Sequence, residues 1–128
     1  MQKKQPSNLE LQVLTVLWDE GPSSAREVMD KMPDGKKRAY TTVLSTLQVL
    51  EKKELVTHES QGNTHIYSPL VERDRVMQPI VRGMVDHIFG GKPSKAVQCF
   101  LEQTEVDDEE LKEIRKLLRS MEKQGKMD

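Results

Sequence analysis

The residues with the clearest chemical purpose lie between positions 36 and 48. Three cations, Lys36, Lys37 and Arg38, stand directly before a segment that apolar periodicity predicts to be a helix beginning at Tyr40. The outward side of that helix carries short polar side chains and no acid, namely Thr41, Thr42, Ser45 and Gln48. A helix amino-terminus beside cations favours phosphate, while hydroxyl and amide groups can bond base edges. This pattern is typical of a helix that enters a groove of double-stranded DNA.

The same stretch is also compatible with an ordinary solvated helix face. The chain of 128 residues has 20 Lys and Arg against 21 Asp and Glu, which gives a net charge of −1. A protein with this balance is not a polycation, so any affinity for nucleic acid depends on where individual cations are placed. An alternative interpretation therefore stays open, in which the domain docks a protein partner and does not bind DNA sequence-specifically.

Two shorter helices are expected before the polar helix and must position it. Ser7 or Asn8 can cap a first helix that runs to about Glu20. Ser24 and Glu27 form a capping box for the second helix, because they stand three residues apart before an apolar run. Tight turns separate the helices, which favours a helix-turn-helix arrangement.

A β hairpin is expected directly after the polar helix. Two strand-like runs flank a loop at residues 61–64 that contains Gly and Asn. A hairpin that follows a third helix predicts a winged helix, here over residues 7–71. The tip of the wing lies beside the third helix in that fold, so we expect Gln61, Asn63 and Thr64 near the DNA backbone. In the alternative interpretation, the hairpin only covers the core.

Residues 72–123 carry dense apolar stripes at helical spacing. Three helices of this length expose more apolar surface than they can hide from one another, so we expect a second copy of the chain to cover it in a two-fold dimer. Alternatively, the stripes fold back onto the amino-terminal core. Pro79 lies inside the first stripe and predicts a kink or a helix restart near Gln78. The residues expected at the dimer interface are Met77, Ile80, Val81, Met84, Ile88, Phe100, Leu101, Leu111, Ile114 and Leu118.

The sequence contains no recognisable catalytic, cofactor-binding or metal-binding constellation. His58, His65 and His87 have no zinc-ligand spacing with the single Cys99, and no nucleophile has a matched base. We therefore expect neither an enzyme, nor a cofactor, nor a bound metal. The apolar runs are too short for a membrane-spanning helix, and one cysteine agrees with the reducing cytoplasm.

Three stretches occur in order and at fitting separations: Leu11–Val28, Ala39–Val43 and Ile66–Val71. Together they resemble the penicillinase repressor family of BlaI and MecI type, and the likeness spans roughly residues 7–123. The resemblance implies a winged-helix amino-terminal half and a helical dimerisation half. It also implies binding of the dimer to a dyad-symmetric operator.

The resemblance extends to individual residues and shows departures. Proteolysis inactivates some members ahead of a Phe in the dimerisation half, which implies a scissile Cys99–Phe100 bond and a regulatory protease, although the family pattern has Asn where Cys99 stands. The family usually has Gly in place of Glu54, and its wing often has Arg in place of Asn63; fewer cations at the wing predict fewer phosphate contacts. The residues that the family would place at the DNA are Arg38, Tyr40, Thr41, Thr42 and Ser45.

The sequence thus predicts a mainly α-helical chain with a small β hairpin, in which a winged helix-turn-helix domain precedes a helical dimerisation region. The expected function is that of a cytoplasmic, dimeric, sequence-specific transcriptional repressor. Its expected partners are a double-stranded DNA operator and a second copy of the chain, with no membrane.

Overall fold

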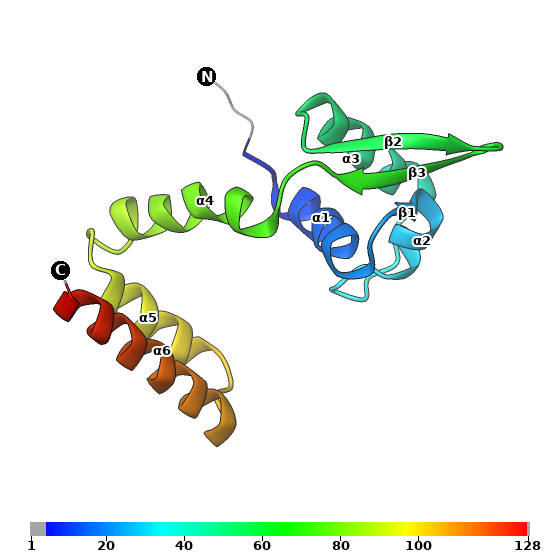
Figure 1. Cartoon of the computed structure of the whole chain (residues 1–128). Coiled ribbons are helices and arrows are strands. Elements are labelled where there is room, and N and C mark those ends of the chain that lie inside the picture. The colour runs from blue at the N-terminus through cyan, green and yellow to red at the C-terminus, as the bar shows by residue number, and fades with distance from the viewer. Residues whose placement is uncertain (1–4, 128) are drawn as a thin grey trace. The chain divides into compact units, whose positions relative to one another are not determined.

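The computed structural model describes the backbone of residues 5–127 and the side chains of residues 5–125. The chain divides into two compact units, Met1–Val81 and Arg82–Asp128. The division falls inside one helix, and the domain boundary expected between residues 71 and 72 stays a prediction. The elements in chain order (Figure 1) are α1 (Asn8–Glu20), β1 (Ser23–Ser24), α2 (Ala25–Asp30), α3 (Tyr40–Lys52), β2 (Val56–Gln61), β3 (Thr64–Pro69), α4 (Arg73–His87), α5 (Pro93–Gln103) and α6 (Asp108–Met127).

Local capping explains where the first two helices begin. Ser7 caps α1 and Ser24 caps α2, and each hydroxyl accepts a hydrogen bond at 3.2 Å from the backbone N–H three residues later. Glu10 and Glu27 return the bond to the backbone N–H of their capping residues, so both capping boxes are complete. The predicted box of α2 is therefore confirmed, and of the two caps considered for α1 the structure uses Ser7.

The sheet of the first unit has one strand more than the expected hairpin. Its three strands are antiparallel neighbours in the order β1–β3–β2. The short β1 joins the sheet because Ser23 pairs with Tyr67 and Ser24 pairs with Ile66. This strand holds the start of α2 against β3, which in turn fixes α2 beside the hairpin.

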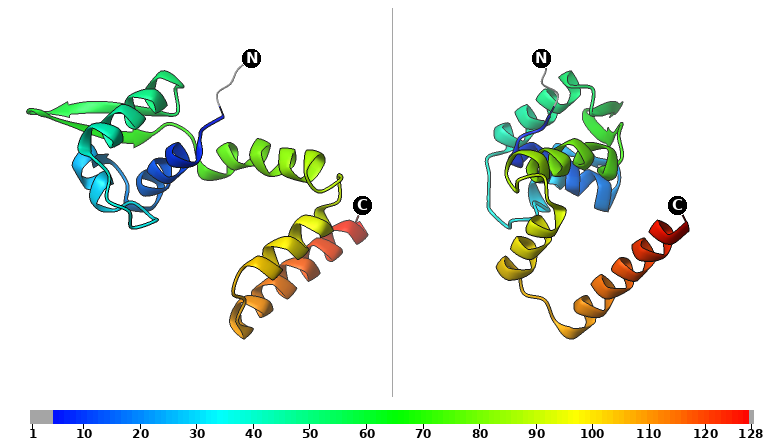
Figure 2. Two further views of the ribbon diagram at one scale, coloured as in Figure 1. Left: turned by 180° about the vertical axis from the view of Figure 1, so that it is seen from behind. Right: turned by 90° about the vertical axis from the view of Figure 1, so that its left-hand side faces the viewer.

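The wing itself is tighter than the sequence predicted. The β2–β3 pairing continues to Gln61 and Thr64, so only Gly62 and Asn63 form the turn. Gly62 has φ 62°, a conformation that glycine adopts without steric cost at the first position of a two-residue hairpin turn. The tip of the hairpin projects beyond α2 and α3 (Figure 1), as the view from behind also shows (Figure 2, left).

One hydrophobic core holds the first unit together. The indole Nε1 of Trp18 donates to the carbonyl of Val71 at 2.9 Å, and this bond ties α1 to the segment that follows β3. Helices α1, α2 and α3 pack with both long strands around the buried side chains of Val13, Leu14, Val16, Leu17, Ala25, Val28, Met32, Val43, Leu47, Leu50, Val56 and Tyr67.

Helix α4 runs without interruption through Pro79. Of the two expected outcomes, the helix restart near Gln78 is therefore wrong, and the kink at Pro79 stays a prediction. A proline at this position deprives the carbonyl of Arg75 of its helical partner. Because Arg75 and Pro79 are both exposed, water can bond to that carbonyl and the helix continues.

The second unit contains few buried side chains. Asp107 caps α6, as expected, by accepting a hydrogen bond from the Glu110 N–H at 2.9 Å. The rings of Phe89 and Phe100 meet edge to face with centroids 6.4 Å apart, and Ala96 is the buried apolar residue among the described residues of this unit. Helices α5 and α6 diverge from the loop that connects them (Figure 2, right). No described helix has both the length and the apolar character needed to cross a membrane.

Candidate nucleic-acid interface

Helix α3 presents one buried and one exposed side, as its sequence periodicity predicted. The buried side packs into the core through Val43, Thr46, Leu47 and Leu50. The exposed side carries Tyr40, Thr41, Thr42, Ser45 and Gln48, together with Val49 and Lys52. The short polar groups therefore lie together on the surface, where the edge of a base could reach them.

Intrahelical hydrogen bonds determine what the hydroxyls of α3 can still do. Ser45 Oγ donates to the carbonyl of Thr41 at 2.6 Å, so its lone pairs remain to accept from an adenine or cytosine amino group. Thr46 donates to the carbonyl of Thr42 at 2.8 Å and is buried. Among the described residues, the Thr41 and Thr42 hydroxyls have no hydrogen-bond partner, so each can donate or accept. The exposed face can thus match more than one base pattern.

The amino-terminus of α3 is open to a ligand. Its N-cap residue is Ala39, which has no side-chain acceptor for the amides of the first turn. Uncapped first-turn amides and the positive end of the helix dipole both favour an anion. Lys36 and Lys37 are exposed in the preceding loop, so two cations flank this helix end.

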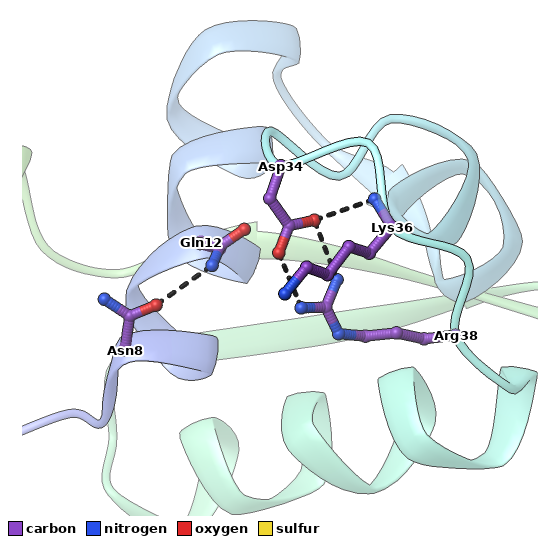
Figure 3. A network of polar contacts seen from close by, with 5 residues as sticks. All are labelled: Asn8, Gln12, Asp34, Lys36 and Arg38. Carbon is purple, nitrogen blue, oxygen red and sulfur yellow. Dashed lines mark hydrogen bonds and ion pairs between the residues drawn. The ribbon is translucent and has the colours of Figure 1, made fainter.

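Arg38, the third predicted cation, is already paired within the loop. Its Nη1 donates to Asp34 Oδ1 at 3.0 Å and its Nη2 donates to Asp34 Oδ2 at 2.7 Å (Figure 3). The same carboxylate accepts from the backbone N–H of Lys36 at 3.0 Å. Gln12 lies on the neighbouring α1, where its Nε2 donates to Asn8 Oδ1 at 3.0 Å. Asp34 therefore organises the loop and the cation that the sequence assigned to DNA.

Electrostatics reinforce this pair. The hydrogen bond from Arg38 and then the bond from the Lys36 N–H hold the pKa of Asp34 well below its usual range, and Gln12 contributes a smaller effect in the same direction. The Asp34 hydrogen bond in turn raises the pKa of Arg38. Both groups are therefore charged over the whole pH range in which proteins normally work.

A groove of about 420 Å³ separates the outer side of α3 from the wing and from the start of α2. Arg26, the second residue of α2, lies in its lining with its Cζ 5.4 Å from the centroid of the Tyr40 ring. Sequence reasoning missed this residue, because only the packing of α2 against α3 brings Arg26 to Tyr40. The remaining lining residues are Ser24, Ala25, Leu44, Gln48, Asn63, Thr64, His65 and Tyr67.

The tip of the wing is polar and uncharged. Gln61, Asn63 and Thr64 are all exposed, as a backbone contact would require. Residues 61–64 contain neither Lys nor Arg, so the wing can offer hydrogen bonds to phosphate but no positive charge.

The two wing histidines serve the structure of the hairpin. His58 Nδ1 lies 2.8 Å from both carboxylate oxygens of Glu51 on α3. The ring of His65 stacks on that of His58 with centroids 4.3 Å apart. Burial, together with the charge of Glu51, raises the pKa of the neighbouring Tyr67. Within the part of the chain that the structure describes, no group of three or more His, Cys, Asp and Glu side chains could hold a metal ion.

Cys99 and Phe100, the expected cleavage site, lie in the middle of α5, so the bond between them belongs to a folded helix.

The residues expected at a dimer interface differ in exposure. The half-buried members of the expected interface are Met77, Ile80, Met84, Leu101 and Ile114. The exposed members are Val81, Ile88, Phe100, Leu111 and Leu118.

These features define the class of protein. Three helices and a three-stranded antiparallel sheet with a projecting hairpin form a winged helix, and α3, which carries the exposed polar face, is the third helix of this domain. Further helices follow, so that the whole chain is mainly α-helical, as predicted.

Comparison with known proteins then identifies the family. The family model described as "Penicillinase repressor" matches residues 6–120, so the chain belongs to the penicillinase repressor family, whose members are transcriptional regulators and not enzymes. The chain is 23% identical over 117 residues to a penicillinase repressor of Staphylococcus aureus, covering 91% of this chain and 93% of that protein.

Other relatives have related names. The transcriptional regulator BlaI of Mycobacterium tuberculosis (strain H37Rv) is 31% identical over 106 residues, with 79% of this chain and 75% of that protein covered. The methicillin resistance regulatory protein MecI of Staphylococcus aureus (strain N315) is 20% identical over 112 residues, with 88% and 91% covered. These matches extend well beyond the winged helix, so the family relationship includes the carboxy-terminal helices.

Proposed function

We propose that this protein is a cytoplasmic, homodimeric transcriptional repressor that binds a dyad-symmetric operator in double-stranded DNA. One observation carries the proposal: a solvent-exposed polar face on α3 coincides with an uncapped helix amino-terminus flanked by Lys36 and Lys37. Each subunit places α3 in a major groove. The relatives named as penicillinase repressors support this assignment.

The side chains divide into two roles. Thr41, Thr42, Ser45 and Gln48 reach base edges, because they occupy the exposed side of α3 and carry donors and acceptors. Phosphate contacts fix the register of the helix without reading sequence. Those contacts come from Lys36, Lys37, Arg38, Tyr40, Gln61 and Asn63, to which the geometry adds Arg26.

The second unit supplies the dimer in this proposal. Exposed apolar side chains on α5 and α6 need a cover, and a second copy can supply it through the same surface. The dimer sets the separation of the two α3 helices, which must match about one turn of duplex, roughly 34 Å. A protease that cleaved between Cys99 and Phe100 would first have to unwind α5, and the cut would divide this dimer region and release the operator.

Mobility-shift titrations over a salt series test the proposal on the parent, Lys36→Ala and Thr42→Ala. We expect the parent to prefer a dyad site selected from genomic fragments and to lose affinity steeply with salt. Lys36→Ala should weaken all sequences alike and reduce the salt slope by about one, whereas Thr42→Ala should reduce discrimination between sites. Absence of any salt-dependent binding by the parent would overturn the proposal in favour of a protein-docking winged helix.

A further inference from the structure

Of the three cations in the loop before α3, Arg38, the one next to the helix, is the least available to DNA. The Arg38 side chain is 19% exposed and bonded to both carboxylate oxygens of Asp34, whereas Lys36 and Lys37 are exposed. The two residues lie four positions apart in the loop that leads into α3. The loop therefore leaves its two lysines accessible to solvent, whereas its arginine is already paired with a carboxylate.

A phosphate and the Asp34 carboxylate compete for the same part of Arg38. The guanidinium bonds carboxylate and phosphate through the same planar fork, two parallel N–H groups to two oxygens. Asp34 already occupies that fork through Nη1 and Nη2. A DNA phosphate must either displace the carboxylate or bind close to its negative charge, and each event costs free energy that an unpaired arginine would not cost.

We propose that Asp34 is an affinity-setting residue of the DNA site, an intramolecular competitor that occupies Arg38 until a phosphate displaces it. The inference rests on the proposed function, since it concerns how tightly the same surface binds DNA. Asp34 lowers affinity for every duplex, because phosphate contacts do not depend on sequence. It also lowers the salt dependence, because the Asp34–Arg38 pair brings no net charge to the duplex.

The substitution Asp34→Asn separates this role from a structural one. The asparagine keeps an Oδ1 that can accept from the Lys36 N–H, so the turn of the loop is retained. In place of Oδ2 it presents an N–H donor toward Arg38 Nη2, which is also a donor, so the ion pair and one of its two bonds are lost and only the neutral bond from Nη1 to Oδ1 can remain. Asp30→Asn is the matched control, because it removes the same charge from an exposed residue of α2 that has no ion pair among the described residues.

The experiment measures binding of the full chain to a duplex of arbitrary sequence by fluorescence anisotropy over a salt series, with thermal melts to verify folding. Asp34→Asn should bind roughly three- to tenfold more tightly at low salt, and its salt slope should steepen by up to about 0.9, because Arg38 then meets the phosphates without a neutralising carboxylate beside it. Asp30→Asn should change the affinity less and leave the slope near that of the parent.

A double-mutant cycle closes the test. In an Arg38→Ala background, Asp34→Asn should change the DNA affinity little further, because Asp34 then has no arginine to pair with. Two outcomes overturn the inference, provided that the parent binds DNA. In the first, Asp34→Asn and Asp30→Asn change the affinity and the salt slope equally. In the second, Asp34→Asn still raises the affinity in the Arg38→Ala background. Binding by Asp34→Asn but not by the parent would support the inference, and absence of binding by every form would overturn the proposed function and this inference together.

Discussion

The two units of this chain bury their apolar side chains to very different extents. Met1–Val81 encloses a continuous core of twelve buried apolar residues, with Leu14, Leu47 and Val28 fully buried. In Arg82–Asp128 several large apolar side chains stay in solvent, and Ile88 is 71% and Met121 65% exposed. The first unit is complete as a folded body, whereas the second presents a surface that isolated soluble domains rarely leave uncovered.

The difference fits the separate tasks that we propose for the two units, DNA binding for the first and dimerisation for the second. A surface that reads bases must be held rigidly, and a closed core beneath α3 provides that support. A surface that assembles must keep apolar groups accessible until a second copy arrives. Each of the following predictions changes one unit and asks whether the other responds.

The largest effect is expected from an acid in the apolar stripe of α6. Leu118→Glu places a charge on a surface that the dimer would bury, so we expect monomers in analytical ultracentrifugation. Operator affinity should fall roughly 10²- to 10⁴-fold, because the two half-sites no longer bind as one unit. Ser120→Glu adds the same charge to an exposed position off the stripe and should remain dimeric. A dimeric Leu118→Glu would show that this stripe is not the interface.

A core truncation should act on the first unit alone. Leu47→Ala removes a fully buried side chain of α3 and should lower the free energy of unfolding of this unit by about 3 kcal/mol. Urea denaturation at several protein concentrations measures this decrease in the free energy of unfolding, which should not depend on protein concentration. Leu117→Ala, at an exposed position of α6, should leave that transition unchanged. Equal losses for both variants would contradict the contrast between the units.

Arg26 tests whether the groove beside the wing belongs to the DNA site. Arg26→Ala removes the cation that lies over Tyr40 and should weaken binding to all duplexes, with a salt slope smaller by about one. Arg75→Ala removes the same charge from an exposed position on α4 and serves as the control. If the two variants bind alike, the groove is not part of the interface. Neither change should alter sedimentation.

The smallest effect concerns the end of α3. Glu54 has φ 64°, in the left-handed region that costs a side chain with a β carbon roughly 1 kcal/mol or more. Glu54→Gly should therefore be more stable than Glu54→Ala, which lacks the same side chain, by about 1 kcal/mol in thermal melts, since glycine adopts this conformation freely. Glu54→Ala keeps the β carbon and should bring no such gain. A stabilised Glu54→Ala would show that the charge, and not the backbone, is responsible.

Several elements followed directly from neighbouring residues. The Ser24 capping box, the Asp107 cap and the buried side of α3 could be predicted because hydrogen bonds and helical periodicity act over three or four positions. The expectation of a restart near Gln78 was wrong because solvent exposure, which short-range patterns do not fix, lets α4 continue through Pro79.

The sequence by itself determined the type of fold and the polar face of α3, because both arise from the spacing of residues along a single element. Only the tertiary structure decided that Ser23 and Ser24 form a third strand, that Arg26 lies over Tyr40, and that Arg38 is held by Asp34. These contacts depend on how elements and loops pack in space. The sequence does not show whether an arginine is exposed or paired, because only its distance to a carboxylate in the folded chain distinguishes the two.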